Sequence, residues 1–142
     1  MRVEPFRPVH LQLLIAQGVQ AAQARQVSHV PASYASVEQP PGLAMTAIEG
    51  ERIVLCGGII PQRPGVGTLW AVLSEHAGEH MVWLHRATRR FMSLQEWQRL
   101  EATVEKGFPQ GCRWLRLLGF KYEGPMPKYG LNGETHVRFG KT

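Results

Sequence analysis

The segment from residue 100 to residue 123 constrains the fold more than any other part of this sequence. Polar and apolar residues alternate over 100–105, which is the period of a β-strand. Beyond Lys106 and Gly107 the apolar residues instead recur at helical spacing, at Phe108, Cys112, Leu115 and Leu118. Gly119 then predicts a helix cap in the left-handed conformation, which glycine adopts at little cost. The segment therefore predicts a strand, a helix, a capping glycine and a further strand.

The beginning of the chain predicts a short strand and a helix. Residues 2–6 favour an edge strand, where a proline is tolerated. Pro8 opens a helix that we expect to end near Arg25, and its apolar stripe comprises Leu11, Leu14, Ile15, Gly18, Val19 and Ala22. Residues 28–42 are rich in serine, alanine and proline, which predicts a long loop.

Three further strands are predicted, over 43–48, 52–60 and 68–73. Gly50 predicts a tight hairpin turn between the first two, and residues 61–67 predict the next turn. Gly57 and Gly58 lie inside the second strand, which indicates either a bulge or a close approach of another backbone segment. The third strand is apolar almost throughout, so we expect it in the centre of the sheet.

A second long helix is predicted to end near Met92, with an apolar face of Met81, Leu84, Thr88 and Phe91. Ser93 and Glu96 have the spacing of a capping box, which predicts a further short helical turn. After the segment at 100–123, the Asn-Gly pair at 132–133 predicts a hairpin turn. It joins an irregular strand and a final strand, over 122–129 and 135–139.

The residues that close the helix before Gly119 resemble a known family signature. Leu118-Gly119-Phe120 followed by Glu123-Gly124 resembles the LGF…EG signature of the GNAT superfamily of acyl-CoA-dependent N-acyltransferases. The predicted order of elements is the GNAT order over nearly the whole chain. The resemblance implies one GNAT-like domain over 1–142, with an α+β fold layered α/β/α. Its sheet would be mixed, mostly antiparallel and flanked by helices.

The resemblance also implies transfer of an acetyl group from acetyl-CoA to an amine by direct attack. In the family, the cofactor pyrophosphate binds main-chain amides after the fourth strand, where the next helix begins. The matching residues here are Leu73, Ser74, Gly78, Glu79 and His80. Gly78 fits the middle glycine of the family pattern Gln/Arg-x-x-Gly-x-Gly/Ala. Glu75 and His80 depart from that pattern.

The catalytic groups are less well defined by the resemblance. The family often places a tyrosine general acid on the last helix, where this chain has Leu115. Tyr122 and Tyr129 lie nearby in sequence, although nothing in their spacing assigns the role. Candidate bases by strand position are Glu49, Glu75 and Glu101, and of all these residues Tyr122 and Glu101 are retained as catalytic candidates. Arginines on the two predicted helices would meet the cofactor phosphates or lie on solvated faces: Arg86, Arg89, Arg90, Arg113 and Arg116.

A second interpretation is a GNAT-fold protein that transfers nothing. Small phage and prophage proteins resemble this chain in size, in an LGF-type C-terminal half and in a degenerate cofactor loop. The chain would then be a structural or assembly protein with a virion partner. The acceptor in the enzymatic interpretation is a small-molecule or protein amine, and a homodimer is compatible with either interpretation.

Two other functions fit the sequence less well. His76, Glu79 and His80 spell the H-x-x-E-H motif of inverted zinc proteases, but Gly78 weakens the helix between the histidines, so we predict no metal site. The formal net charge of +5 favours an anionic partner. Because the chain has no nucleic-acid-binding motif and no run of basic residues, we do not predict nucleic acid as its primary partner.

Composition points to a cytoplasmic protein with no membrane partner. Cys56 and Cys112 both lie in apolar segments and are expected to be reduced thiols. No apolar run approaches the roughly 20 residues of a membrane-spanning helix, and the N-terminus has no signal-peptide pattern. The phage interpretation would place the chain in a virion instead.

Overall fold

The computed structural model describes residues 1–18, 42–130 and 132–142. The predicted end of the first helix near Arg25 and the predicted loop over 28–42, apart from Gly42, lie outside the described residues. No helix within the described ranges is long and apolar enough to cross a membrane.

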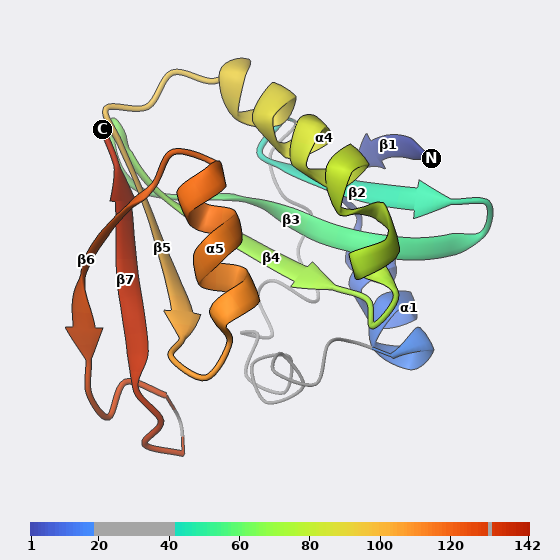
Figure 1. Cartoon of the computed structure of the whole chain (residues 1–142). Coiled ribbons are helices and arrows are strands. Elements are labelled where there is room, and N and C mark those ends of the chain that lie inside the picture. Colours follow the sequence, from blue (N-terminus) through green and yellow to red (C-terminus); the bar gives the residue numbers. More distant parts are fainter. Residues whose placement is uncertain (19–41, 131) are drawn as a thin grey trace. The chain divides into compact units, whose positions relative to one another are not determined.

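In the described residues, seven strands and three α-helices follow one another in the predicted order (Figure 1). They are β1 (Arg2–Pro5), α1 (Pro8–Gln17), β2 (Ala44–Glu49), β3 (Arg52–Arg63), β4 (Val66–Leu73), the 3-10 helix η1 (Ala77–His80), α4 (Met81–Ser93), β5 (Arg99–Glu105), α5 (Pro109–Leu117), β6 (Lys121–Met126) and β7 (His136–Lys141). The strands form one sheet in the order β1-β2-β3-β4-β5-β7-β6. Strands β4 and β5 are parallel, and the pairs β1–β2, β2–β3, β5–β7 and β6–β7 are antiparallel. The α+β class, the mixed sheet and the central position of β4 are therefore confirmed.

Contacts divide the chain into two compact units. Unit 1 contains Met1–Ile59 and Trp70–Ala87, and unit 2 contains Ile60–Leu69 and Thr88–Thr142. Strands β3 and β4 and helix α4 each contribute residues to both units. The single domain over 1–142 stays a prediction.

The core of unit 1 forms where α1 packs against the sheet. Leu11 and Leu14 of α1 belong to a buried cluster with Phe6, Ala44, Ile48, Ile53, Cys56 and Val72. The predicted stripe is wrong at Ile15, which is 44% exposed, because one residue beyond Leu14 is about 100° further around the helix. The helix ends at Gln17, earlier than predicted, and Gly18 follows it with a φ of 107°.

Strands β2 and β3 form the predicted hairpin. Glu49 pairs with Arg52 across a two-residue turn, in which Gly50 has a φ of 58°. The glycine pair in β3 marks a close approach, because a Cβ atom on Gly58 would lie 2.3 Å from the carbonyl oxygen of Leu43. The register irregularity lies elsewhere in this hairpin. Ala47 pairs with Leu55 and the next residue, Ile48, pairs with Ile53, so Val54 has no partner in the register of β2 and β3.

The predicted turn over 61–67 is wrong in its extent. Strand β3 continues to Arg63 and β4 begins at Val66, so only Pro64 and Gly65 remain between them. Pro61 therefore lies inside β3. A proline has no amide hydrogen, so a strand accommodates it only where that residue donates no hydrogen bond to a neighbouring strand.

Unit 2 contains the segment that most constrained the fold. Helix α5 contacts β5 and β6, and the parallel pairing of β4 with β5 covers the beginning of both strands. The Gly119 amide donates to the Arg116 carbonyl and the Phe120 amide to the Leu115 carbonyl, both at 3.0 Å. With Gly119 at a φ of 96°, these bonds form a Schellman motif, so the predicted glycine cap is confirmed.

The end of α4 and the hairpin of β6 and β7 also belong to unit 2. The predicted capping-box turn at Ser93 is wrong, since Ser93 is the last residue of α4 and its hydroxyl donates to the Arg90 carbonyl at 2.7 Å. The strand predicted over 122–129 is irregular as expected but shorter, because β6 ends at Met126 and its register shifts between Tyr122 and Gly124. Gly133 has a φ of 78° in the turn before β7, as the Asn-Gly pair predicts.

Candidate functional site

The turn that leaves β4 is held by long-range hydrogen bonds from its own amides. The Ser74 amide donates to the carbonyl of Val54, the residue that the hairpin register skips, at 2.9 Å. The Glu75 amide donates to the Gly18 carbonyl at 3.3 Å, just beyond the end of α1. The His76 amide donates to the Ser74 hydroxyl at 3.2 Å. Three consecutive amides of this turn are thus occupied by protein acceptors.

The next amides belong to η1, which runs directly into α4. The Ala77 amide donates to the Ser74 carbonyl at 3.1 Å, and the Glu79 amide donates to the His76 carbonyl at 3.2 Å. Within the described part of the chain, the amide of Gly78 has no such acceptor. Gly78 is exposed, and a Cβ atom there would meet nothing within 4 Å. The start of this helix therefore offers one open main-chain donor together with the partial positive charge of a helix N-terminus.

The side chains that depart from the GNAT pattern are paired. The His80 imidazole Nε2 lies 2.7 Å from a carboxylate oxygen of Glu49 on β2, and the His80 side chain is 19% exposed. The Glu75 carboxylate lies 3.4 Å from His76 Nε2 and stands beside Gly18. The Glu75 carboxylate therefore has an imidazole as its neighbour.

The predicted cofactor residues differ in what they offer a ligand. Leu73 and Ser74 are buried, and the amides of Ser74 and Glu79 already donate within the protein. The Glu79 side chain is exposed. Gly78 alone of the five combines exposure with an open amide. The assignment of all five residues to a cofactor stays a prediction.

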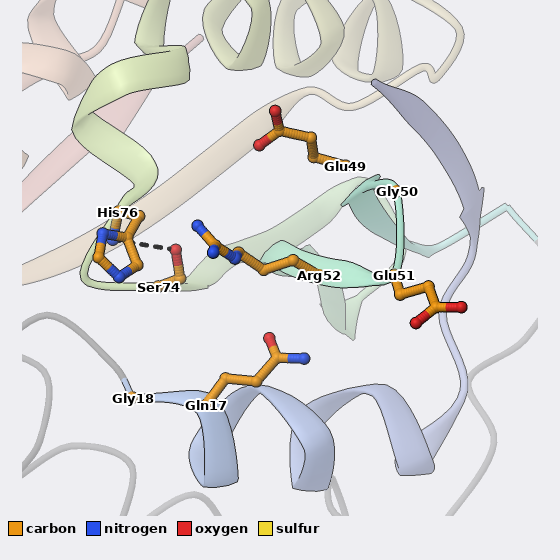
Figure 2. Close-up of a pocket in the computed structure, with 8 residues that line it drawn as sticks. All are labelled: Gln17, Gly18, Glu49, Gly50, Glu51, Arg52, Ser74 and His76. Carbon is orange, nitrogen blue, oxygen red and sulfur yellow. Dashed lines mark hydrogen bonds between the residues drawn. The ribbon is translucent and has the colours of Figure 1, made fainter.

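A hollow of about 660 Å³ lies beside this turn within unit 1. Figure 2 shows its walls, which come from the end of α1, the β2–β3 turn and the β4–η1 turn. The lining residues are Gln17, Gly18, Glu49, Gly50, Glu51, Arg52, Ser74 and His76. Sequence analysis singled out only some of them. Arg52 and Gln17 were missed, because nothing local in the sequence brings the end of α1 to the hairpin turn.

Glu101, the candidate base on β5, is engaged by two arginines in unit 2. Its side chain is 13% exposed, Arg99 Nε lies 2.9 Å from one carboxylate oxygen, and Arg138 lies 3.9 Å from the other. Arg99 also holds Glu123 through both of its terminal nitrogens. Hydrogen bonds to Glu123 and Glu101 raise the pKa of Arg99, and the bond from Arg99 lowers the pKa of Glu123. Both carboxylate oxygens of Glu101 therefore lie close to arginine side chains.

The remaining sequence candidates are not among the ion-pair partners of Glu101 and Glu123 in the described residues. Tyr122 is 51% exposed, and its ring meets Phe139 edge-on at 5.8 Å. Leu115, at the position of the family's tyrosine, is buried in the core. The five helix arginines are exposed, and Arg116 lies over the ring of Phe139 at 5.5 Å.

A buried polar chain in unit 1 was also missed by sequence analysis. His10 Nδ1 accepts the Arg7 amide at 3.1 Å and the Thr46 hydroxyl at 2.7 Å, and Cys56 Sγ lies 3.9 Å from the same hydroxyl. Burial, aided by the charge of Arg7, lowers the pKa of His10, and burial raises the pKa of the Cys56 thiol to about 12. A thiol that stays protonated and buried is inert. The hydrogen-bonded series of His10, Thr46 and Cys56 therefore joins α1 to the sheet and supplies no nucleophile.

No group of three or more histidine, cysteine, aspartate or glutamate residues within 1–18, 42–130 and 132–142 is arranged to hold a metal ion. In the H-x-x-E-H segment, His80 is instead bound to Glu49.

Comparison with solved structures finds this arrangement of elements in acetyltransferases. The ribosomal-protein-alanine N-acetyltransferase from Brucella melitensis is 14% identical, with a TM-score of 0.67 over 99% of each chain. Ard1 from Thermoplasma volcanium is 11% identical, with a TM-score of 0.74 over 99% of this chain and 95% of that one. An acetyltransferase of the GNAT family from Streptococcus pneumoniae is 15% identical, with a TM-score of 0.63 over 99% and 98%. Neither protein-family models nor curated protein sequences give a match. At these identities the likeness establishes the fold.

Proposed function

Because the chain has the fold of GNAT-family acetyltransferases along its whole length, we propose that it is an N-acyltransferase that uses acetyl-CoA. The acceptor is an amine of a small molecule or a protein. The observation that carries the proposal is the extent of the fold, which includes the helix that begins directly after the central strand β4. A shared fold alone does not fix chemistry, so the proposal also depends on the residues of that turn.

The residues of the turn fit the cofactor only in part. The Gly78 amide and the positive end of the helix that begins at η1 are suited to a phosphate oxygen. The remaining amides of the turn over 74–79 are occupied, so the cradle of several main-chain donors that the family pattern implies is reduced to one. Acetyl-CoA supplies an acyl group already activated as a thioester, and an amine can accept it directly. We expect affinity for the cofactor to be modest and to depend strongly on Gly78.

The same turn favours a second candidate, a GNAT-fold protein that binds partners and transfers no acyl group. Its specific support is the set of occupied amides together with the His80–Glu49 pair, since His80 fills the place of a small residue in the family pattern. The phage or prophage assembly role belongs to this candidate.

Calorimetric titration of the full chain with acetyl-CoA separates the two candidates. Gly78→Pro removes the open amide, and proline is compatible with the first turn of a helix. Gly78→Ala is the matched control, because it keeps the amide and its Cβ atom has open space. We expect saturable binding by the wild type and by Gly78→Ala, and binding about tenfold weaker by Gly78→Pro, in keeping with the loss of one hydrogen bond to a charged group. If titration with millimolar acetyl-CoA gives no heat of binding, the result would support the second candidate, the GNAT-fold protein that transfers no acyl group.

A further inference from the structure

We propose that the hollow between α1, the β2–β3 turn and the β4–η1 turn binds an oxyanion through the side chain of Arg52. The oxyanion is either a phosphate or a carboxylate group of a ligand. The site does not depend on acyl transfer, and it uses side-chain donors where the main-chain donors of the neighbouring turn are occupied.

The hollow is held open by bonds between all of its walls. The Ile53 amide donates to Gln17 Oε1 at 3.1 Å, which joins β3 to the end of α1. The Glu75 and Ser74 amides join the β4–η1 turn to Gly18 and Val54. The Glu49–His80 pair, at 2.7 Å, joins the hairpin turn to η1. A site framed in this way needs little ordering when a ligand binds, which favours affinity.

Arg52 is the cation available inside this frame. In Figure 2 its side chain extends across the hollow toward the end where Ser74 and His76 stand. No described residue forms an ion pair or a side-chain hydrogen bond with its guanidinium group. A guanidinium group stays charged at every relevant pH, and its planar fork matches the oxygens of carboxylate and phosphate groups.

The other lining groups are compatible with an anion. Since Gln17 Oε1 accepts the Ile53 amide, the part of its side-chain amide left for a ligand is the NH₂ donor. Glu49 is bound by His80, and Figure 2 shows Glu51 directed away from Ser74 and His76. Glu49 therefore already has a partner in His80, and Glu51 is turned away from the end of the hollow that the Arg52 side chain approaches (Figure 2).

The test is calorimetric titration of the full chain with three probes: inorganic pyrophosphate, coenzyme A and succinate. Arg52→Gln removes the charge, Arg52→Lys keeps the charge without the fork, and Arg63→Gln removes an exposed charge at the far end of β3 as the control. We expect at least one probe to bind the wild type and Arg63→Gln equally. That probe should bind Arg52→Gln about 10- to 100-fold more weakly, with Arg52→Lys intermediate.

The probes identify the source of the oxyanion. Binding of pyrophosphate and coenzyme A indicates phosphate, and binding of succinate alone indicates carboxylate. The proposal is overturned if the wild type binds none of the three, or if Arg52→Gln binds each probe as tightly as the wild type does. If Gly78→Pro loses coenzyme A binding while Arg52→Gln binds all three probes as tightly as the wild type does, the proposed function stands and this site is overturned. Thermal unfolding of each variant confirms that it is folded.

Discussion

The close approach of two backbones at Gly58 makes a quantitative prediction for Gly58→Ala. Gly58 pairs with Ala44 across the β2–β3 ladder, and a new Cβ atom would lie 2.3 Å from the Leu43 carbonyl oxygen and 2.7 Å from the Ala44 Cα atom. Ordinary contact begins near 3.4 Å, so the strands must separate by about 1 Å. That separation strains the bond from the Ile59 amide to the Leu43 carbonyl, which is 2.8 Å long.

Two costs follow from this separation. Overpacking in a filled core costs about 1–3 kcal/mol, and a weakened ladder bond adds about 0.5–1.5 kcal/mol. We therefore expect Gly58→Ala to lower the free energy of unfolding by about 2–4 kcal/mol, with a fall in Tm of about 10 °C. Urea unfolding followed by circular dichroism measures the change.

Gly78→Ala is the matched control for this prediction. The same methyl group is added, but nothing lies within 4 Å of it, and alanine is the better helix former by up to about 1 kcal/mol. Its stability should equal or exceed that of the wild type. If Gly58→Ala unfolds within about 0.5 kcal/mol of the wild type, the backbones do not approach as the structure describes.

Three further predictions concern buried or constrained groups. Because the folded protein holds His10 neutral with a lowered pKa while the unfolded chain takes up a proton near 6.5, the free energy of unfolding should fall as the pH drops below 6.5. His10→Asn, which keeps an acceptor, should show a smaller fall in urea titrations at pH 7 and pH 5, and equal falls would contradict this origin. Gly119→Ala places alanine at a φ of 96° and should cost about 1–2 kcal/mol in the same assay, whereas an unchanged midpoint would argue against the Schellman cap. A thiol reagent should modify the half-buried Cys112 of the native protein well before Cys56, and denaturant should equalise the two, so rapid native labelling of Cys56 would refute its burial.

The parts of the fold that could be predicted are those that depend on residues close together in the sequence. The cap at Gly119, the hairpin at Gly50 and the turn at Gly133 each depend on a glycine that must adopt a positive φ. The order of strands and helices follows from the periodicity of apolar residues, because the apolar face of each element packs against a core. Errors in extent arose at Pro61, which signals a turn in sequence but lies in a strand.

The location of the candidate site in the chain could be predicted, but the hydrogen-bond partners of its residues could not. Gly78 marks the start of the helix, but the amides of Glu75 and Ser74, earlier in the same turn, donate to the carbonyls of Gly18 and Val54, which lie far away in sequence. The same holds for Arg52, whose role depends on the end of α1 reaching the hairpin turn through the bond between Ile53 and Gln17. The spacing of side chains along the sequence does not indicate contacts between residues that are so far apart in it.

The most direct test of cofactor binding follows the amide of Gly78 itself. In a ¹H–¹⁵N correlation spectrum of the full chain, added acetyl-CoA should shift the Gly78 amide resonance strongly, because that donor is open. The Ser74 amide, already bound to the Val54 carbonyl, should move little. A Gly78 resonance that stays in place at millimolar acetyl-CoA would contradict the proposal that this helix start receives the cofactor.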